Sequence, residues 1–160
     1  MSIARFSRVS EGRFAADTAK LTGCIPVQEI PLPHRATAGS AGYDFVAPMP
    51  VTVPAGGTAL IPTGIRCEMD TDWVLLLFPR SSLGFRYGIR LANTAGVIDS
   101  DYAHAENEGH IMVKLRNDSD SDVNLKAGER FCQGIFLPYG LAEEAQPLAE
   151  RTGGMGSTGK

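Results

Sequence analysis

Two polar clusters in the sequence follow directly on apolar runs, where a buried strand would deliver functional groups to the edge of a core. Asp99 and Asp101 follow the apolar pair in "GVIDSDY", and a carboxylate at such an edge can orient or deprotonate water. The stretch "WVLLLFPRSSLG" runs into Arg80, Ser81 and Ser82, a guanidinium and two hydroxyls suited to binding phosphate. Taken alone, each cluster is also explained by a polar turn or a serine helix cap.

Three further polar side chains stand in strand-like runs. Asn93 in "ANTAGV" carries an amide able to pair with a nucleobase edge, although asparagine is equally common in turns. Gln133 in "GERFCQGIF" interrupts an apolar run. Its side chain therefore needs either a hydrogen-bond partner in the protein or a position at the edge of the sheet, where water can bind it. Asp44 in "AGYDF" is either a site carboxylate or an outward-facing residue of an alternating strand.

The last stretch, "AERTGGMGSTGK", is rich in hydrogen-bond donors and poor in apolar surface. Its bare glycine N–H groups, its hydroxyls and Arg151 all donate to anions. The stretch is therefore either a frayed chain end or an arm that becomes ordered when a phosphate arrives.

The elements that position these groups are predicted to be β-strands. Glycine and proline, 18 and 10 of 160 residues, are spread along the chain between short runs of β-branched and aromatic residues. This spacing favours an all-β barrel or double-sheet jelly roll. The runs "VTVPAGGTAL" and "VNLKAGERF" are predicted to be hairpins. Only "GRFAADTAKL" and "SSLGFRYG" offer short helices, the second with a serine in the cap position.

The run "HIMVKLR" shows the clearest strand alternation. Its predicted inward residues are Ile111, Val113 and Leu115, and its predicted outward residues are His110, Met112, Lys114 and Arg116.

Length and composition predict one domain, residues 1–141, whose first 30 residues have no assigned role, followed by a tail of residues 142–160. The net charge of −3 argues against bulk binding to nucleic acid or anionic membranes. The start lacks the apolar segment of a secretory signal, and no run is long enough to span a membrane. Cys24, Cys67 and Cys132 form no Cys-x-x-Cys pair, so we expect reduced thiols in a cytoplasmic protein.

Five stretches, in this order, carry a family resemblance: "SAGYDF", "PRSSLG", "NTAGVIDSDY", "GERFCQGIF" and "GGMGSTG". Together they resemble the five motifs of the trimeric dUTPases. The resemblance implies a distorted β-barrel of the jelly-roll type, assembled as a homotrimer with active sites at the subunit interfaces. It also implies Mg²⁺-dependent hydrolysis of dUTP to dUMP and pyrophosphate, which limits uracil incorporation into DNA and supplies dUMP for dTMP synthesis.

The resemblance also implies roles for individual residues. Asp99 matches the aspartate that activates the attacking water, and Tyr102 matches the residue whose ring packs on deoxyribose and excludes a 2′-hydroxyl. Asn93 matches the asparagine of the pyrimidine pocket, where Gly96 and Ile98 stand close to the base. The phosphate side is matched by Arg80, Ser81, Ser82, Gln133, Arg151, Gly156, Ser157 and Thr158.

One further residue, Asp44, matches a family motif, and the chain differs from the common family motifs at three places. Asp44 matches an aspartate tied to the water shell of the magnesium ion or to the subunit interface. The family commonly stacks a phenylalanine on uracil where this chain has Met155, and its arginine stands at the position of Glu150, one residue before Arg151. After "GVIDSDY" the family commonly continues Arg-Gly-Glu, whereas this chain has the longer "AHAENEGHI". The glycine-rich tail is expected to be a mobile arm that closes over a neighbouring subunit's substrate.

Two alternative functions share the fold. The dCTP deaminases have similar "RSS" and "ID" motifs, but they place a catalytic glutamate where this chain has Lys114, which disfavours deamination. A non-enzymatic trimer that binds a regulatory protein is the other alternative, and it would leave Asp99 and the glycine-rich tail without a purpose.

Overall fold

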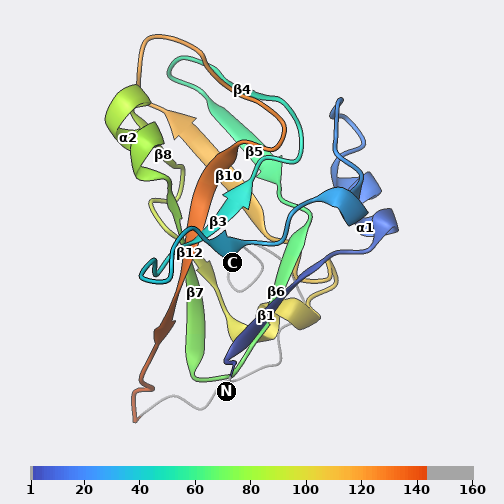
Figure 1. Cartoon of the computed structure of the whole chain (residues 1–160), viewed down its shortest axis with the longest axis vertical. Helices are drawn as coiled ribbons and strands as arrows, with labels where there is room; N and C mark the ends of the chain where they lie inside the picture. Colours follow the sequence, from blue (N-terminus) through green and yellow to red (C-terminus); the bar gives the residue numbers. More distant parts are fainter. Residues whose placement is uncertain (1, 144–160) are drawn as a thin grey trace.

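Antiparallel β-sheets are the main regular structure of the computed structural model, which describes residues 2–143 (Figure 1). The strands are β1 (Ala4–Arg8), β2 (His34–Arg35), β3 (Tyr43–Val46), β4 (Val51–Val53), β5 (Thr58–Pro62), β6 (Ile65–Met69), β7 (Trp73–Pro79), β8 (Ile89–Leu91), β9 (Gly96–Ile98), β10 (Met112–Asn117), β11 (Val123–Leu125) and β12 (Arg130–Pro138). The helical pieces are α1 (Glu11–Asp17), α2 (Ser81–Tyr87) and the 3₁₀ turns η1 (Val27–Glu29) and η2 (Ser100–His104). The prediction of a mainly β protein is confirmed. Within residues 2–143, no helix is long and apolar enough to cross a membrane.

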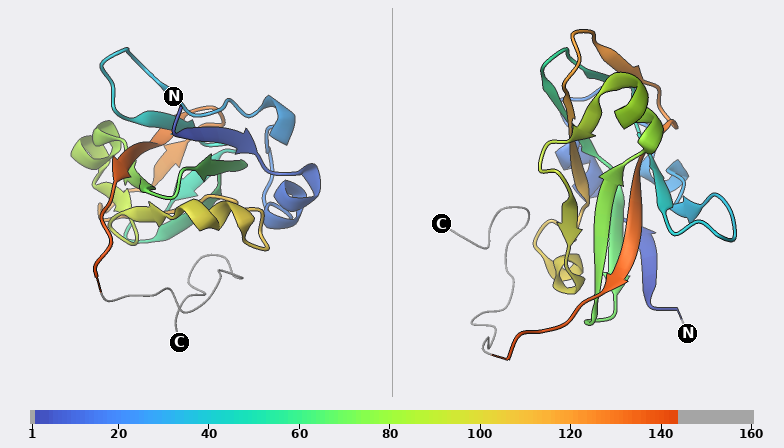
Figure 2. Two further views of the ribbon diagram at one scale, coloured as in Figure 1. Left: turned by 90° about the horizontal axis from the view of Figure 1, so that it is seen from below. Right: turned by 90° about the vertical axis from the view of Figure 1, so that its left-hand side faces the viewer.

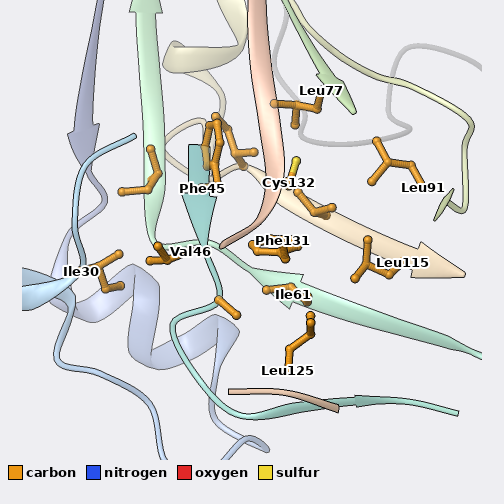
Figure 3. Close-up of a cluster of buried hydrophobic side chains, with 14 of the residues drawn as sticks. Ile30, Phe45, Val46, Ile61, Leu77, Leu91, Leu115, Leu125, Phe131 and Cys132 are labelled. Atoms are coloured by element: carbon orange, nitrogen blue, oxygen red, sulfur yellow. The ribbon is translucent and has the colours of Figure 1, made fainter. Parts of the chain in front are cut away.

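The largest sheet has five strands in the order β2-β3-β12-β7-β9. A second sheet has the order β5-β10-β8, and the pairs β1-β6 and β4-β11 complete the fold. Side chains from β3, β5, β7, β10 and β12 meet in one core, and Figure 3 shows Phe45, Ile61, Leu77 and Leu115 around Phe131. Strand β12 therefore lies at the centre of both the largest sheet and the core.

The two predicted hairpins are wrong. Strand β4 pairs with β11, and β5 pairs with β10. In the same way β12 follows β11 in the chain but pairs with β3 and β7. The glycine turns are present, with Gly56 at φ 61° and Gly128 at φ 80°, but each carries the chain from one sheet to another. Local sequence specified the turns but not the partners of the strands.

The predicted alternation of "HIMVKLR", which contains most of β10, is confirmed for its three inward residues. Ile111, Val113 and Leu115 are buried, whereas Lys114 is exposed. His110 was predicted to face outward, and that prediction is wrong, because it precedes the strand and is fully buried. Its ring lies against Phe14 of α1, at a centroid distance of 6.2 Å.

Both short helices form, on opposite sides of the molecule (Figures 1 and 2). Helix α1 is capped by Ser10, whose Oγ accepts a hydrogen bond from the Arg13 N–H at 3.1 Å. The cap position of α2 is held by Arg80 and not by a serine, and no side chain makes the capping bond. Helix α2 ends at Gly88, whose φ of 64° suits glycine.

The N-terminal segment is an integral part of this fold. All five residues of β1 pair with β6. At the start of α1, Ser10 donates to Glu108 from both its backbone N–H, at 2.8 Å, and its hydroxyl, at 2.6 Å. These bonds join the segment to the loop of residues 105–110, which lies within the stretch "AHAENEGHI".

A buried histidine makes the second link between α1 and this loop. The Nε2 of His110 accepts a hydrogen bond from the Gly64 N–H at 2.8 Å, so the neutral ring carries its proton on Nδ1 and donates it to Asp17 at 2.6 Å. Burial lowers the pKa of His110, although Asp17 acts in the opposite direction. Burial alone would raise the pKa of Asp17, but its hydrogen bonds from Arg13 and His110 outweigh burial and lower it.

The free energy of unfolding is expected to fall as the pH drops below about 6.5, the ordinary pKa of histidine. Below that pH the His110 imidazole becomes protonated in the unfolded chain, whereas its lowered pKa keeps it neutral in the folded protein, so the unfolded state is favoured. Asp17, Arg13 and Glu108 are the charged groups around the imidazole. Melting temperatures by calorimetry, at about pH 7.5 and about pH 5, will measure the effect. His110→Gln removes this proton uptake and should flatten the profile. Parallel profiles for the two proteins would contradict the assignment.

Candidate active site

A pocket of about 310 Å³ opens beside the turn that joins β8 and β9. It is lined by Leu77, Leu91, Ala92, Asn93, Gly96, Met112, Val113 and Lys114. Asn93 and Gly96, two of the residues predicted for the pyrimidine pocket, are therefore at a cavity. Ile98, the third, is buried opposite Leu75 of β7.

Backbone geometry shapes the wall of this pocket. Thr94 has a φ of 70°, and its N–H donates to the Leu91 carbonyl at 3.1 Å, which closes a tight turn around Asn93. At Gly96 a Cβ would lie 3.0 Å from the Leu77 Cβ. Glycine at this position lets β9 approach β7 closely, and the pocket forms along that contact.

Asp99 follows directly on β9 and stands at the N-terminal end of η2. It has an extended backbone, with φ −77° and ψ 157°, and is half-buried. Its carbonyl accepts a hydrogen bond from the Tyr102 N–H at 3.1 Å. One 3₁₀ turn thus fixes the carboxylate residue relative to Tyr102, which is 4% exposed.

A second group of predicted residues gathers where β3 and β12 meet the start of α2. The Asp44 carboxylate accepts a hydrogen bond from Arg130 Nη1 at 2.9 Å, and Arg80 Nε lies 3.5 Å from its other oxygen. Gln133 is the register partner of Asp44, and its side chain lies against Gly42, where a Cβ would require the Gln133 amide to shift. The strand pairing thus brings together residues from three of the motifs.

Arg130 belongs to this group, although sequence reasoning did not single it out. It stands in "GERFCQGIF", and the need of Asp44 for a positive partner was the signal that could have identified it. The side chain of Asp44 is only 10% exposed, so its charge requires compensation from a neighbouring cation.

Ser81 and Ser82 lie exposed in the first turn of α2, directly after Arg80. The Arg80 N–H donates to the Phe131 carbonyl at 3.1 Å. This bond ties the beginning of the helix to β12 and holds the two hydroxyls beside the group around Asp44.

The pocket and the second group lie on opposite faces of β7. Gln133 pairs with Phe78, whereas Gly96 pairs with Leu77, which lines the pocket. Successive side chains of a strand point to opposite sides of the sheet. A nucleotide in the pocket of one protomer would therefore not meet the Asp44 group of that same protomer across β7.

The remaining predicted residues, Arg151, Met155, Gly156, Ser157 and Thr158, lie outside the described residues. Within residues 2–143, no three side chains of the His, Cys, Asp and Glu types gather as metal ligands would.

Comparisons with known proteins agree with the five motifs. The dUTPase family model matches residues 28–159. A deoxyuridine 5'-triphosphate nucleotidohydrolase from Lactococcus lactis is 44% identical over 133 residues, which are 81% of this chain and 89% of that protein. One from Glaesserella parasuis is 42% identical over 140 residues, which are 82% and 89%. The crystal structure of the Streptococcus mutans dUTPase covers 86% of this chain and 98% of its own, with a TM-score of 0.68 and 36% identity. The predicted resemblance is confirmed, and the chain belongs to the dUTPase family.

Proposed function

We propose that this protein hydrolyses dUTP to dUMP and pyrophosphate by attack of water on the α-phosphate. The observation that carries the proposal is the order of groups along one short segment: Asn93 at a pocket, then Asp99, then Tyr102 after a single 3₁₀ turn. A base, a reacting phosphate and a sugar could be contacted in turn by these three residues.

The pocket beside Asn93 is proposed to hold uracil. The Asn93 amide and the backbone groups of the turn would pair with the base edge, and the close approach of β9 at Gly96 limits the space. An amide that pairs with the carbonyl and N–H of uracil faces the wrong donor pattern in cytosine, and a tight pocket leaves no room for the methyl group of thymine.

Asp99 is proposed to be the general base. Its position at the end of β9 holds the carboxylate on a defined backbone, and the carboxylate would orient a water molecule and take its proton during attack. Proton transfer to a positioned carboxylate would supply part of the rate enhancement over the uncatalysed reaction. Neutralisation of the negative charge on the phosphates would supply another part.

Arg80, Ser81, Ser82 and Gln133 are proposed to bind the phosphates. Arg80 lies 3.5 Å from Asp44, whereas Arg130 holds the same carboxylate at 2.9 Å. Arg80 is therefore able to turn toward an anion while Asp44 keeps its charge compensated by Arg130.

The residues present fit a magnesium ion that arrives with the triphosphate. Both Asp44 oxygens face guanidinium groups, so this carboxylate suits a contact through the water shell of the ion better than direct coordination. Mg²⁺ commonly keeps several waters and takes substrate phosphates as ligands. When bound, it supplies positive charge to the phosphate oxygens.

The active protein is proposed to be a homotrimer of jelly-roll subunits, with each site shared between protomers. The support is the placement of the pocket and the Asp44 group on opposite faces of β7. A base in one protomer's pocket would then present its phosphates to the Asp44 group of the next, and a three-fold axis closes such contacts into a ring.

Residues 142–160 are proposed to be an arm that closes over the substrate, attached to the β domain of residues 1–141. Met155 would cover the base, and Arg151, Gly156, Ser157 and Thr158 would donate to the phosphates. Closing an arm of this kind excludes water and strengthens the charge interactions within the site.

The three cysteines of the chain are free thiols, which agrees with a reducing compartment, and we propose that the protein works in the cytoplasm.

Replacing Asp99 with Asn is expected to lower kcat for dUTP by about 10²–10⁴-fold, because the amide cannot accept the proton. Pyrophosphate release and equilibrium binding of dUTP are the two measurements, and binding should persist. Asp120→Asn, at an exposed position in a surface turn, is the matched control.

Release of ammonia from dCTP by the unaltered protein would favour deamination instead, although Lys114 at the pocket argues against it.

Removing residues 152–160 is expected to lower kcat/KM for dUTP by at least about 10²-fold, since donors to the phosphates are lost. Light scattering should show the same oligomer before and after removal. Deletion of Lys160 alone serves as the control. Full activity of the shortened protein would exclude an arm that takes part in catalysis.

A further inference from the structure

The hydroxyl of Tyr102 is held from two sides by the loop of residues 105–110. It donates to the His110 carbonyl at 2.8 Å, and it accepts a hydrogen bond from the Asn107 amide at 2.8 Å. With both roles of the hydroxyl filled and only 4% of the residue exposed, the ring has little freedom to rotate or withdraw.

The loop that holds Tyr102 is itself tightly constrained. The Asn107 side-chain oxygen accepts a hydrogen bond from the Gly109 N–H at 3.2 Å, and the His110 N–H donates to the Asn107 carbonyl at 3.1 Å. Gly109 has a φ of 69°, and a Cβ there would lie 2.6 Å from the Ala103 Cα. The loop therefore packs directly on the turn that carries Tyr102.

Helix α1 fixes the far end of the loop. Asp17 binds the buried His110 ring, whose other nitrogen accepts from the Gly64 N–H. The His110 carbonyl is the acceptor for the Tyr102 hydroxyl. A continuous path of hydrogen bonds thus runs from Asp17 through His110 to Tyr102.

We propose that Asn107 and the Asp17–His110 pair are positioning residues for Tyr102, and that they set the preference for a 2′-deoxyribose over a ribose nucleotide. The inference rests on the proposed function, in which the Tyr102 ring contacts the sugar. A ring that cannot withdraw leaves no space for a 2′-hydroxyl. A ring released from its hydrogen bonds can move aside and admit one.

The test measures kcat and KM for dUTP and UTP separately, together with the melting temperature. In Asn107→Ala the ratio of kcat/KM for dUTP to that for UTP is expected to fall about ten-fold, the effect of one lost buried hydrogen bond. Asn124→Ala, an exposed asparagine at the other end of the molecule, should leave the ratio unchanged. A purely structural role would lower the melting temperature and both activities while the ratio stayed constant, and that result would overturn the proposal.

Two further comparisons sharpen the test. Asp17→Ala should lower the ratio, whereas Asp17→Asn retains an oxygen that accepts from His110 and should restore most of it. Tyr102→Phe keeps the ring and removes both hydrogen bonds of the hydroxyl, so its effect should be at least as large as that of Asn107→Ala, and the double variant should match Tyr102→Phe alone. Equal ratios for the two Asp17 variants, or additive effects in the double variant, would overturn the proposal. Failure of the unaltered protein to release pyrophosphate from dUTP would refute the proposed function instead.

Discussion

The pairing of β12 on both of its edges is the constraint on which the rest of the structure depends. Strand β3 lies on one side of it and β7 on the other. Gly134 makes this possible, because a Cβ there would lie 2.7 Å from the Leu75 side chain and 3.2 Å from that of Phe45. With β12 in place, Gln133 meets Asp44, and the carbonyl of Phe131 receives the N–H of Arg80. The same contacts that close the core therefore assemble the polar group proposed to bind phosphate.

The opposite end of the molecule is organised around a buried imidazole and not around a strand. His110 has both ring nitrogens engaged, one with Asp17 and one with the Gly64 backbone. Burying such a polar ring is tolerated because each nitrogen has a partner. The arrangement joins α1, the residue before β6 and the loop of residues 105–110, and the buried Phe14 ring of α1 packs against the same imidazole.

The sequence predicted the features that depend on local pattern. The inward residues of β10, the two short helices and the clustering of motif residues follow from periodicity, from capping preferences or from the family resemblance. The partners of β4, β5 and β11 could not be predicted, because strand pairing depends on residues far apart in the chain. His110 and Arg130 were missed for the same reason: the carboxylates that bind them, Asp17 and Asp44, lie 93 and 86 residues away.

The link between α1 and the loop of residues 105–110 has an evolutionary consequence. The family model begins at residue 28, after α1, and covers the loop of residues 105–110. A chain that lost the helix would leave the imidazole of His110 without its acceptor and Glu108 without Ser10. Helix α1 and the partner residues of this loop are therefore expected to vary together among relatives.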